Sequence, residues 1–291
     1  MQSVHDAPAL RETLGKRRAA GSVVLVPTMG ALHAGHLSLV EIARTRAGES
    51  GTVVVSIFVN PIQFDRRDDL AAYPRPLDAD LCACRAAGVD VVFAPEARAV
   101  YAPDRSVTVT ESALSKHLCG AARPGHFDGV CTVCLKLFLL TGCNAAVFGE
   151  KDFQQLAIIR RMTRDLDVPV EIIAGPTLRE PDGLAMSSRN ARLTAAQRDD
   201  APRIQRALRA AAAMHAHAPA EMLAHARREI DASPHARIDY LGHVDGETLE
   251  AAGNSSPGRT TILAAAVFYG DVRLIDHVTL PGNSAAGGDS A

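Results

Sequence analysis

Short apolar runs alternate with longer stretches of mixed polarity over the first 177 residues of the chain. The short runs are rich in Val and Ile and lack a clean two-residue alternation, which is typical of strands buried on both faces of a parallel sheet. They predict five strands, at Val23–Val26, Val53–Val59, Val89–Phe93, Ala145–Phe148 and Val170–Ile173. The longer stretches predict helices at Leu37–Arg46, Leu77–Ala87, Val130–Leu140 and Phe153–Leu166. This alternation favours a doubly wound parallel α/β sheet.

The pattern changes after Thr177. An Ala- and Arg-rich segment and a second amphipathic segment predict two helices, at Thr194–His217 and Ala220–Asp231. Three further runs predict antiparallel strands, at Arg237–Val244, Thr260–Val267 and Val272–Ile275. We therefore predict a sheet domain over residues 1–177 and a smaller α+β domain over residues 178–291. The Gly-, Ser- and Ala-rich tail Pro281–Ala291 is predicted to be disordered.

Composition narrows the class of protein. Of the 291 residues, 47% are hydrophobic and 22% are charged, which favours a folded protein over a disordered one. The formal net charge of −2 leaves little positive charge to neutralise nucleic-acid phosphates, so we expect no nucleic-acid partner. Because the chain has neither a basic start followed by an apolar stretch nor a run of about 18 apolar residues, we expect a cytoplasmic protein without a membrane partner.

The chain has six cysteines, at Cys82, Cys84, Cys119, Cys131, Cys134 and Cys143. A chain of this length is no small disulfide scaffold, so we expect free thiols. Cys131 and Cys134 form a C-x-x-C pair, which could indicate a redox or zinc site. They lie in an apolar stretch of helical spacing and no second pair follows, which favours buried structural cysteines.

The segment Val26–His36, VPTMGALHAGH, joins the first predicted strand to the first predicted helix. Gly30 and Gly35 allow the backbone to approach phosphates, and a helix start presents N–H groups to an anion. His33 and His36 share one face of the first helical turn. They could bind a nucleotide phosphate, form a metal pair or simply start the helix. The position after a buried strand favours the nucleotide, and the motif resembles the H-x-G-H signature of the nucleotidyltransferase superfamily, which includes class I aminoacyl-tRNA synthetases.

Two further segments carry groups suited to phosphate. Met186–Asn190 offers hydroxyls and a guanidinium, and beside H-x-G-H it resembles the mobile second phosphate-binding loop of that superfamily. Gly149–Asp152 follows the fourth predicted strand, where Lys151 can balance phosphate charge and Asp152 can hold a ribose hydroxyl or a magnesium water shell. A solvated loop and a capped surface ion pair are the respective alternatives.

A polar residue also follows the second predicted strand. Within Ser56–Phe64, Pro61 ends the strand and leaves Gln63 near the same sheet edge. An amide both donates and accepts hydrogen bonds, which fits a hydroxy acid. A loop-stabilising role for Gln63 fits the sequence equally well.

Five segments, taken in order, resemble the pantothenate synthetase family. They are Pro27–His36, Phe58–Phe64, Arg123–Phe127, Phe148–Gln155 and Asp182–Asn190, with a looser match at Arg273–Asp276. The resemblance implies an AMP-forming ligase that joins pantoate to β-alanine through a pantoyl-adenylate, giving pantothenate, a coenzyme A precursor. It also implies a homodimer whose Rossmann-like domain binds ATP and pantoate and whose smaller C-terminal domain closes as a lid.

The resemblance assigns roles to individual residues. His36 matches the family's proton donor. Gln63 and Gln155 match its pantoate contacts, with Gln63 also near β-alanine. The ATP contacts match Met29, Gly30, Ala31, Leu32, His33, Ala34, Gly35, His36, Gly149, Glu150, Lys151, Asp152, Leu178, Met186, Ser187, Ser188 and Arg189.

Some assignments stay open at this point. Mg²⁺ is expected to bind through the ATP phosphates, with Asp80 and Asp152 as candidates for its water shell. Arg123 and His126 are secondary candidates near the pantoate or phosphate site, and loop packing is their alternative. A nucleotidyltransferase acting on a phosphorylated small molecule, a tRNA-binding synthetase and a non-catalytic ATP-binding module are the rival functions. The lack of a G-x-S-x-G elbow is consistent with a ligase that needs no protein nucleophile.

Overall fold

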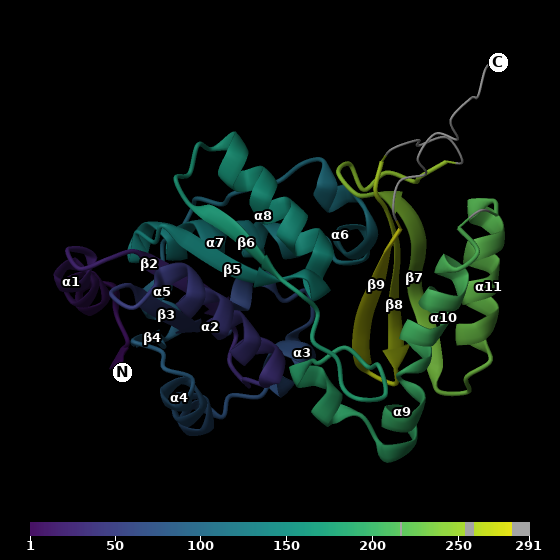
Figure 1. Ribbon diagram of the computed structural model, residues 1–291, viewed down its shortest axis with the longest axis horizontal. Coiled ribbons are helices and arrows are strands. Elements are labelled where there is room, and N and C mark those ends of the chain that lie inside the picture. Colours follow the sequence, from purple (N-terminus) through teal and green to yellow (C-terminus); the bar gives the residue numbers. More distant parts are fainter. Residues whose placement is uncertain (216, 254–258, 281–291) are drawn as a thin grey trace. The chain divides into compact units, whose positions relative to one another are not determined.

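The computed structural model describes residues 1–215, 217–253 and 259–280, which fold into two compact units (Figure 1). The first unit comprises Met1–Glu111, Arg123–Glu150 and Gln155–Leu178, and the second comprises Ser112–Ala122, Lys151–Gln154 and the residues from Arg179 onward. Sequence pattern could not show the two short excursions into the second unit, because they are defined by contacts between distant segments. The tail predicted to be disordered, Pro281–Ala291, lies outside the described residues.

Six parallel strands form the sheet of the first unit, in the order β1-β4-β3-β2-β5-β6. They are β1 (Gln2–Val4), β2 (Val23–Thr28), β3 (Thr52–Ile57), β4 (Val91–Phe93), β5 (Ala145–Gly149) and β6 (Glu171–Gly175). The last five coincide with the predicted apolar runs, so the predicted parallel α/β sheet is confirmed. β1 was missed because three residues are too few to show a pattern.

Helices cover both faces of this sheet. On one face α2 (Ala34–Ala47) and α4 (Leu77–Ala86) pack against the buried valines of the strands. On the other face α7 (His126–Thr141) brings the Phe138 ring to 6.3 Å from that of Phe148. The unit also contains α1 (Ala7–Arg18), α3 (Arg67–Ala72), α5 (Ala97–Val100), most of α8 (Phe153–Asp165) and the 3₁₀ helix η1 (Pro61–Gln63).

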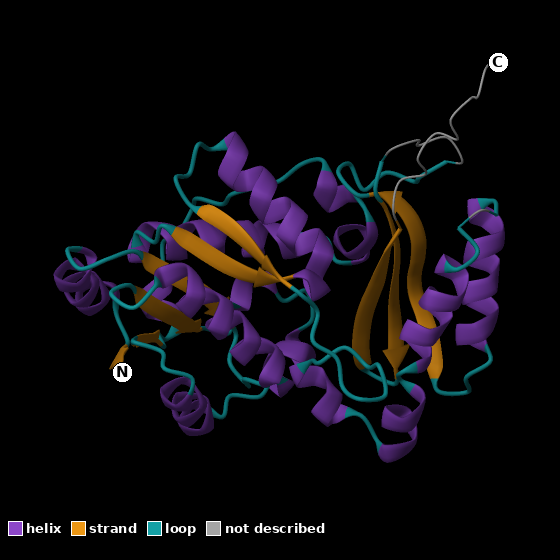
Figure 2. Cartoon of the chain, viewed as in Figure 1, coloured by secondary structure: helices purple, strands orange, loops and turns teal. Residues whose placement is uncertain are grey.

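The second unit is a three-stranded antiparallel sheet with helices packed on it (Figure 2). Its strands are β7 (Ala236–Asp245), β8 (Thr261–Tyr269) and β9 (Val272–Leu280), and its principal helices are α9 (Ala195–Asp200), α10 (Arg203–Ala212) and α11 (Pro219–Asp231). It also contains α6 (Leu118–Ala122), the 3₁₀ helices η2 (Leu114–Lys116) and η4 (Ser188–Arg192), and most of η3 (Glu150–Asp152). The predicted α+β character is confirmed.

One predicted helix of the second unit was wrong in its length. The expected helix over Thr194–His217 is two helices, which are separated just before α10 at Pro202. Proline has no backbone N–H to donate and its ring clashes with the preceding turn, so a helix breaks there. The sequence is rich in Ala on both sides of Pro202, so the helical pattern looked continuous across the break.

All six cysteines are free, as predicted, and all except Cys82 are buried. Cys131 and Cys134 lie within α7, and burial raises the pKa of the Cys131 thiol to about 12. A protonated, buried thiol is a poor nucleophile and metal ligand, which supports the structural interpretation of the C-x-x-C pair.

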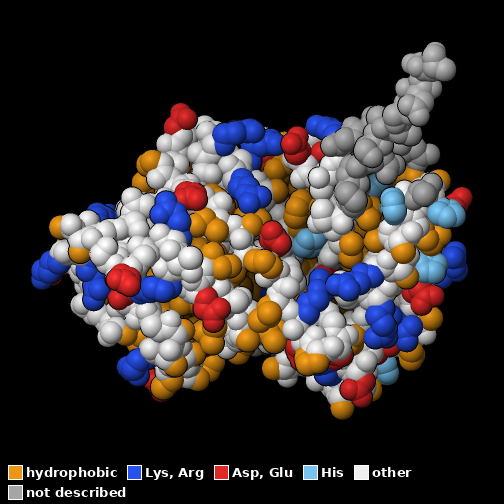
Figure 3. All heavy atoms as spheres, viewed as in Figure 1, with side chains coloured by type: hydrophobic (Ala, Val, Ile, Leu, Met, Phe, Trp, Pro, Cys, Tyr) orange, Lys and Arg blue, Asp and Glu red, His pale blue; other side chains and the backbone are white. Residues whose placement is uncertain are grey.

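Two findings bear on the expected absence of membrane and nucleic-acid partners. No helix among the described residues combines the length and the apolar character that crossing a bilayer requires. On the face seen in Figure 3, Lys and Arg side chains are interspersed with acidic and uncharged ones.

Candidate active site

The H-x-G-H segment lies at the carboxyl end of the central strand of the first unit. β2 ends at Thr28, His33 is the N-cap residue, and α2 begins at Ala34. β2 lies between β3 and β5, so the strand order reverses beside it. Open α/β sheets bind ligands at such a switch point. Gly149 ends β5, so two of the predicted phosphate segments follow neighbouring strands.

Asp80, a buried residue of α4, holds the glycine loop. Its carboxylate accepts hydrogen bonds from the N–H groups of Ala31 at 2.9 Å and Leu32 at 2.8 Å. Gly30 has a φ of +80°, and a Cβ there would lie 2.8 Å from Asp80 Oδ2, so the loop requires glycine. Asp80 therefore anchors this loop, and its candidacy for the magnesium water shell stays a prediction. The backbone N–H groups of Ala31 and Leu32 donate to Asp80. A contact of either residue with phosphate would therefore use other atoms of that residue.

The two histidines lie together at the start of α2, with ring centroids 4.0 Å apart. The N–H of His33 donates to Nδ1 of His36 at 3.3 Å. Because Nδ1 accepts this bond, neutral His36 carries its proton on Nε2. The helix start thus makes His36 Nε2 a hydrogen-bond donor of the kind that binds phosphate oxygens.

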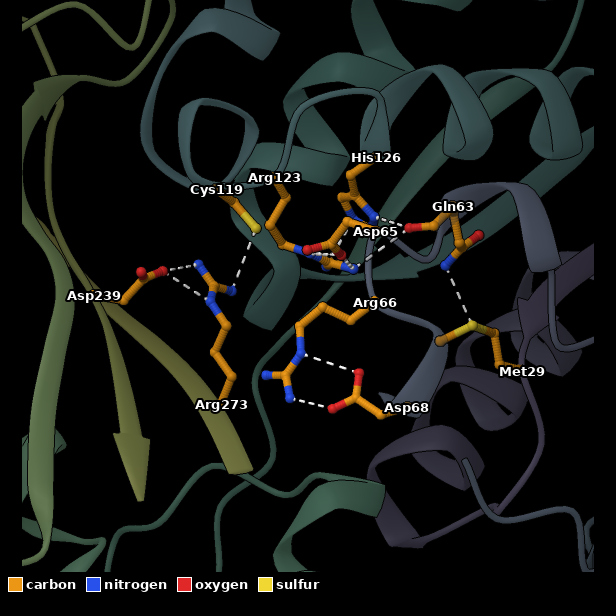
Figure 4. Close-up of polar contacts among 10 residues, drawn as sticks. All are labelled: Met29, Gln63, Asp65, Arg66, Asp68, Cys119, Arg123, His126, Asp239 and Arg273. Carbon is orange, nitrogen blue, oxygen red and sulfur yellow. Dashed lines mark hydrogen bonds and ion pairs between the residues drawn. The ribbon is translucent and has the colours of Figure 1, made fainter. Parts of the chain in front are cut away.

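Gln63 is buried, and its amide has a defined orientation (Figure 4). The Tyr101 hydroxyl donates to Asn60 Oδ1 at 2.9 Å. Asn60 Nδ2 therefore donates to the carbonyl of Gly129 at 3.0 Å and to Oε1 of Gln63 at 2.9 Å. This arrangement turns Gln63 Nε2 toward Met29 Sδ, at 3.2 Å. The amide nitrogen is a donor, which suits the carboxylate or hydroxyl oxygen of a hydroxy acid.

Sequence reasoning gave no role to Asn60 or Tyr101. Burial raises the pKa of Tyr101, so its hydroxyl stays protonated and donates to Asn60. A polar Asn directly before Pro61, at the end of an apolar strand, is a signal that could have identified Asn60. Tyr101 is 41 residues away in sequence, and no local pattern connects the two.

The secondary candidates Arg123 and His126 lie beside the main chain of Gln63. His126 Nδ1 is 2.7 Å from the Gln63 carbonyl oxygen, and Arg123 Nε is 2.7 Å from Asp65 Oδ1. Burial by itself would raise the pKa of Asp65, but the hydrogen bond and charge of Arg123 outweigh it and hold this pKa below its usual value. These contacts within the protein are the kind that the loop-packing alternative predicts, and they lie beside Gln63, the residue expected to bind pantoate.

The segment after β5 contains both structural and candidate residues. Lys151 Nζ lies 3.8 Å from Asp152 Oδ1, the ion pair considered as the alternative for these residues. Gln154 is buried and makes three hydrogen bonds to the main chain of Leu114–Cys119. Gln155 is partly exposed. Gln155, rather than Gln154, therefore remains the candidate for binding pantoate.

The second phosphate segment, Met186–Arg189, lies in the second unit. Its Ser187 hydroxyl accepts the N–H of Arg189 at 3.2 Å and caps η4. The turn leading into it is anchored by Arg179, whose guanidinium binds both oxygens of the buried Asp276 at 2.7 and 2.9 Å. Such a two-bond pair fixes geometry as well as position. Arg179 was not predicted, and Asp276 belongs to the segment that matched only loosely.

Other features limit what the site can hold. A cavity of about 450 Å³ adjoins the glycine loop, lined by Met29, Gly30, Asp80 and mainly apolar residues around the ends of β3 and β4. No group of three or more His, Cys, Asp or Glu side chains in the described part of the chain is placed to hold a metal ion. A metal pair at His33 and His36 would thus lack a third protein ligand among those residues.

Leu178, a further residue expected to contact ATP, is exposed at the end of the first unit.

A parallel α/β sheet with a glycine loop and a helix start at its switch point is the arrangement of a nucleotide-binding α/β protein. Comparison with known proteins gives the family. The family model described as pantoate-beta-alanine ligase matches residues 2–279. The chain therefore belongs to the pantoate–β-alanine ligase family.

Individual relatives agree with this assignment over nearly the whole chain. The pantothenate synthetase of Akkermansia muciniphila is 53% identical, with 96% of this chain and 100% of that protein aligned. The crystal structure of the Thermus thermophilus enzyme gives a TM-score of 0.88 at 43% identity, covering 96% of this chain and 99% of that one. The Francisella tularensis ligase, complexed with beta-gamma ATP and β-alanine, gives a TM-score of 0.79 at 31% identity, covering 96% and 97%.

Proposed function

We propose that this chain uses ATP to condense pantoate with β-alanine, forming pantothenate and releasing AMP and pyrophosphate. The observation that carries the proposal is the 3.2 Å contact between Gln63 Nε2 and Met29 Sδ. Through this contact, the residue expected to bind pantoate touches the loop expected to bind ATP. Adenylate formation needs that proximity, because the carboxylate must reach the α-phosphorus. The Francisella relative is complexed with beta-gamma ATP and β-alanine, which supports ATP and β-alanine as substrates here.

The reaction has two steps. A carboxylate is a poor acyl donor because its leaving group would be oxide, so it must first be activated. The pantoate carboxylate attacks the α-phosphorus of ATP, and pyrophosphate leaves. The β-alanine amine then attacks the carbonyl carbon of the pantoyl-adenylate and displaces AMP, so no protein nucleophile is required.

The protein contributes positioning and charge stabilisation to these steps. Nε2–H of His36 donates to a phosphate oxygen as negative charge develops there. Lys151 and Arg189 balance phosphate charge, and Gln63 holds pantoate through its amide nitrogen. Mg²⁺ would bind through the ATP phosphates and would neutralise part of their charge.

The homodimer, the cytoplasmic location and the lid role of residues 178–291 belong to the same proposal and rest on the family resemblance. Val107 and Leu139 are the most exposed of the large apolar side chains of the first unit, and a second copy could cover them. Sedimentation velocity at micromolar concentration should give the mass of a dimer, and a monomer would contradict that part of the proposal.

The proposed activity is tested by AMP formation from ATP, with pantoate and β-alanine present together and each omitted in turn. We expect sustained AMP release only when both are present. Pantoate alone should support exchange of labelled pyrophosphate into ATP. A nucleotidyltransferase would keep the nucleotide on its product, and a non-catalytic module would bind ATP without releasing pyrophosphate.

Replacing Gln63 with alanine should impair pantoate use and leave ATP binding close to that of the wild type. The lost amide is a donor to the substrate, and removing one hydrogen bond to a charged group costs about 1.5–3 kcal/mol, or roughly a 10- to 150-fold rise in pantoate KM. Pantoate saturation kinetics and direct ATP titration measure the two effects. Equal losses in both would indicate a scaffold role for Gln63.

A further inference from the structure

Gln63 is held at its main chain as well as at its amide. His126 Nδ1 lies 2.7 Å from the Gln63 carbonyl oxygen, and Arg123 Nη2 lies 3.4 Å from the same oxygen (Figure 4). Gly129, one turn further along α7, is so close that a Cβ there would lie 2.6 Å from Gln63 Cα. The first turn of α7 therefore fixes the backbone from which the Gln63 side chain extends.

The neighbours of His126 determine its tautomer. A carbonyl oxygen only accepts, so Nδ1 must donate to Gln63. A guanidinium only donates, so Nε2 must accept from Arg123 Nη1, 3.3 Å away. Asp65 holds Arg123 in place through contacts of 2.7 Å to both Nε and Nη2. In its neutral form His126 therefore carries its proton on Nδ1, the opposite tautomer to that of His36.

We propose that His126, supported by Arg123, is a positioning residue for pantoate. Its Nδ1–H holds the Gln63 carbonyl, so that the Gln63 amide meets the substrate oxygen at a fixed position. This inference rests on the proposed function, in which Gln63 binds pantoate. If His126 only filled space in the core, its replacement would alter stability and affect pantoate and ATP alike.

Two substitutions of His126 distinguish the effect of losing the Nδ1–H donor from the effect of changing the side-chain volume. In His126→Asn the amide nitrogen falls near the position of Nδ1 and can still donate to the Gln63 carbonyl. In His126→Gln the amide nitrogen falls near Nε2 and cannot. We expect pantoate KM to rise about tenfold in His126→Gln, as for one lost hydrogen bond, and to stay within about twofold of wild type in His126→Asn. The ATP KM should be unchanged in both variants.

Steady-state AMP formation, with pantoate and ATP varied separately, measures these constants. A wild-type chain that forms no AMP would overturn the proposed function itself. An active wild type whose two variants share one pantoate KM, or whose ATP KM rises as much as its pantoate KM, would overturn the positioning role alone.

A measurement on the wild-type chain covers the case in which a variant fails to fold. In ¹⁵N spectra at neutral pH, His126 should show a protonated Nδ1 and a bare Nε2. The Nε2–H tautomer, or an imidazolium, would overturn the proposal without reference to any variant.

Discussion

Replacing His36 with alanine is expected to slow turnover about 10²- to 10³-fold, the typical cost of removing one preorganised donor from developing negative charge. The chain should remain folded, because His36 lies in the first turn of α2 and is only partly buried. Steady-state kinetics and thermal unfolding test the two halves of this prediction. Wild-type turnover in a folded His36→Ala variant would refute the assignment.

A matched pair of variants tests whether the donor at Nε2 is what matters. The amide nitrogen of glutamine reaches near the position of Nε2, whereas that of asparagine reaches near the position of Nδ1. His36→Gln should therefore retain more turnover than His36→Asn. At His126 the proton is required on Nδ1 instead, so the asparagine variant should be closer to the wild type than the glutamine variant.

Replacing Asp80 with asparagine is expected to reduce both stability and turnover. An amide has one acceptor oxygen, so either the Ala31 or the Leu32 N–H would face its NH₂ group instead. A buried donor without an acceptor costs about 1–3 kcal/mol of unfolding free energy. The loop also leads to His36, and misplacing a catalytic group by about 1 Å can cost roughly 10²-fold in rate.

Urea unfolding and kcat measurements test the Asp80 prediction. Asp78→Asn is the matched control, because Asp78 is exposed on the same helix. It should resemble the wild type in both measurements. If Asp80→Asn unfolded at the wild-type urea concentration and kept full turnover, the loop would not depend on this anchor.

The main elements of the fold could be predicted because burial imposes a pattern on them. Strands covered on both faces must be apolar throughout, and β2, β3, β4 and β5 show this pattern. The edge strand β6 is only partly buried, but its Ile-rich run was apolar enough to predict. The missed helix α1 is largely polar, but its N-terminal signal was present in the sequence. Asp6 accepts the N–H of Ala9 at 2.8 Å, and Pro8 stands in the first turn. Capping chemistry could thus have identified a helix that apolar periodicity did not.

In the candidate site, some residues could be predicted from local motifs and others could not. Groups expected to face a ligand could be proposed from motifs, because His33, His36 and Gln63 lie in the segments that follow β2 and β3. The residues that orient them could not be assigned these roles. Asp80 reaches the glycine loop from 48 and 49 positions away, and Tyr101 reaches Asn60 from 41 positions away. Such contacts depend on which strands become neighbours, and no local pattern specifies that order.

The central claim is that pantoate is activated as an acyl-adenylate, and the fate of its carboxylate oxygen tests this directly. If that carboxylate attacks the α-phosphorus, one of its oxygens becomes the bridge of the adenylate and leaves with AMP. Mass spectrometry of AMP formed from ¹⁸O-carboxylate pantoate, ATP and β-alanine should therefore show one labelled oxygen in AMP. Unlabelled AMP, or ADP as the sole nucleotide product, would contradict the adenylate mechanism even if pantothenate were formed.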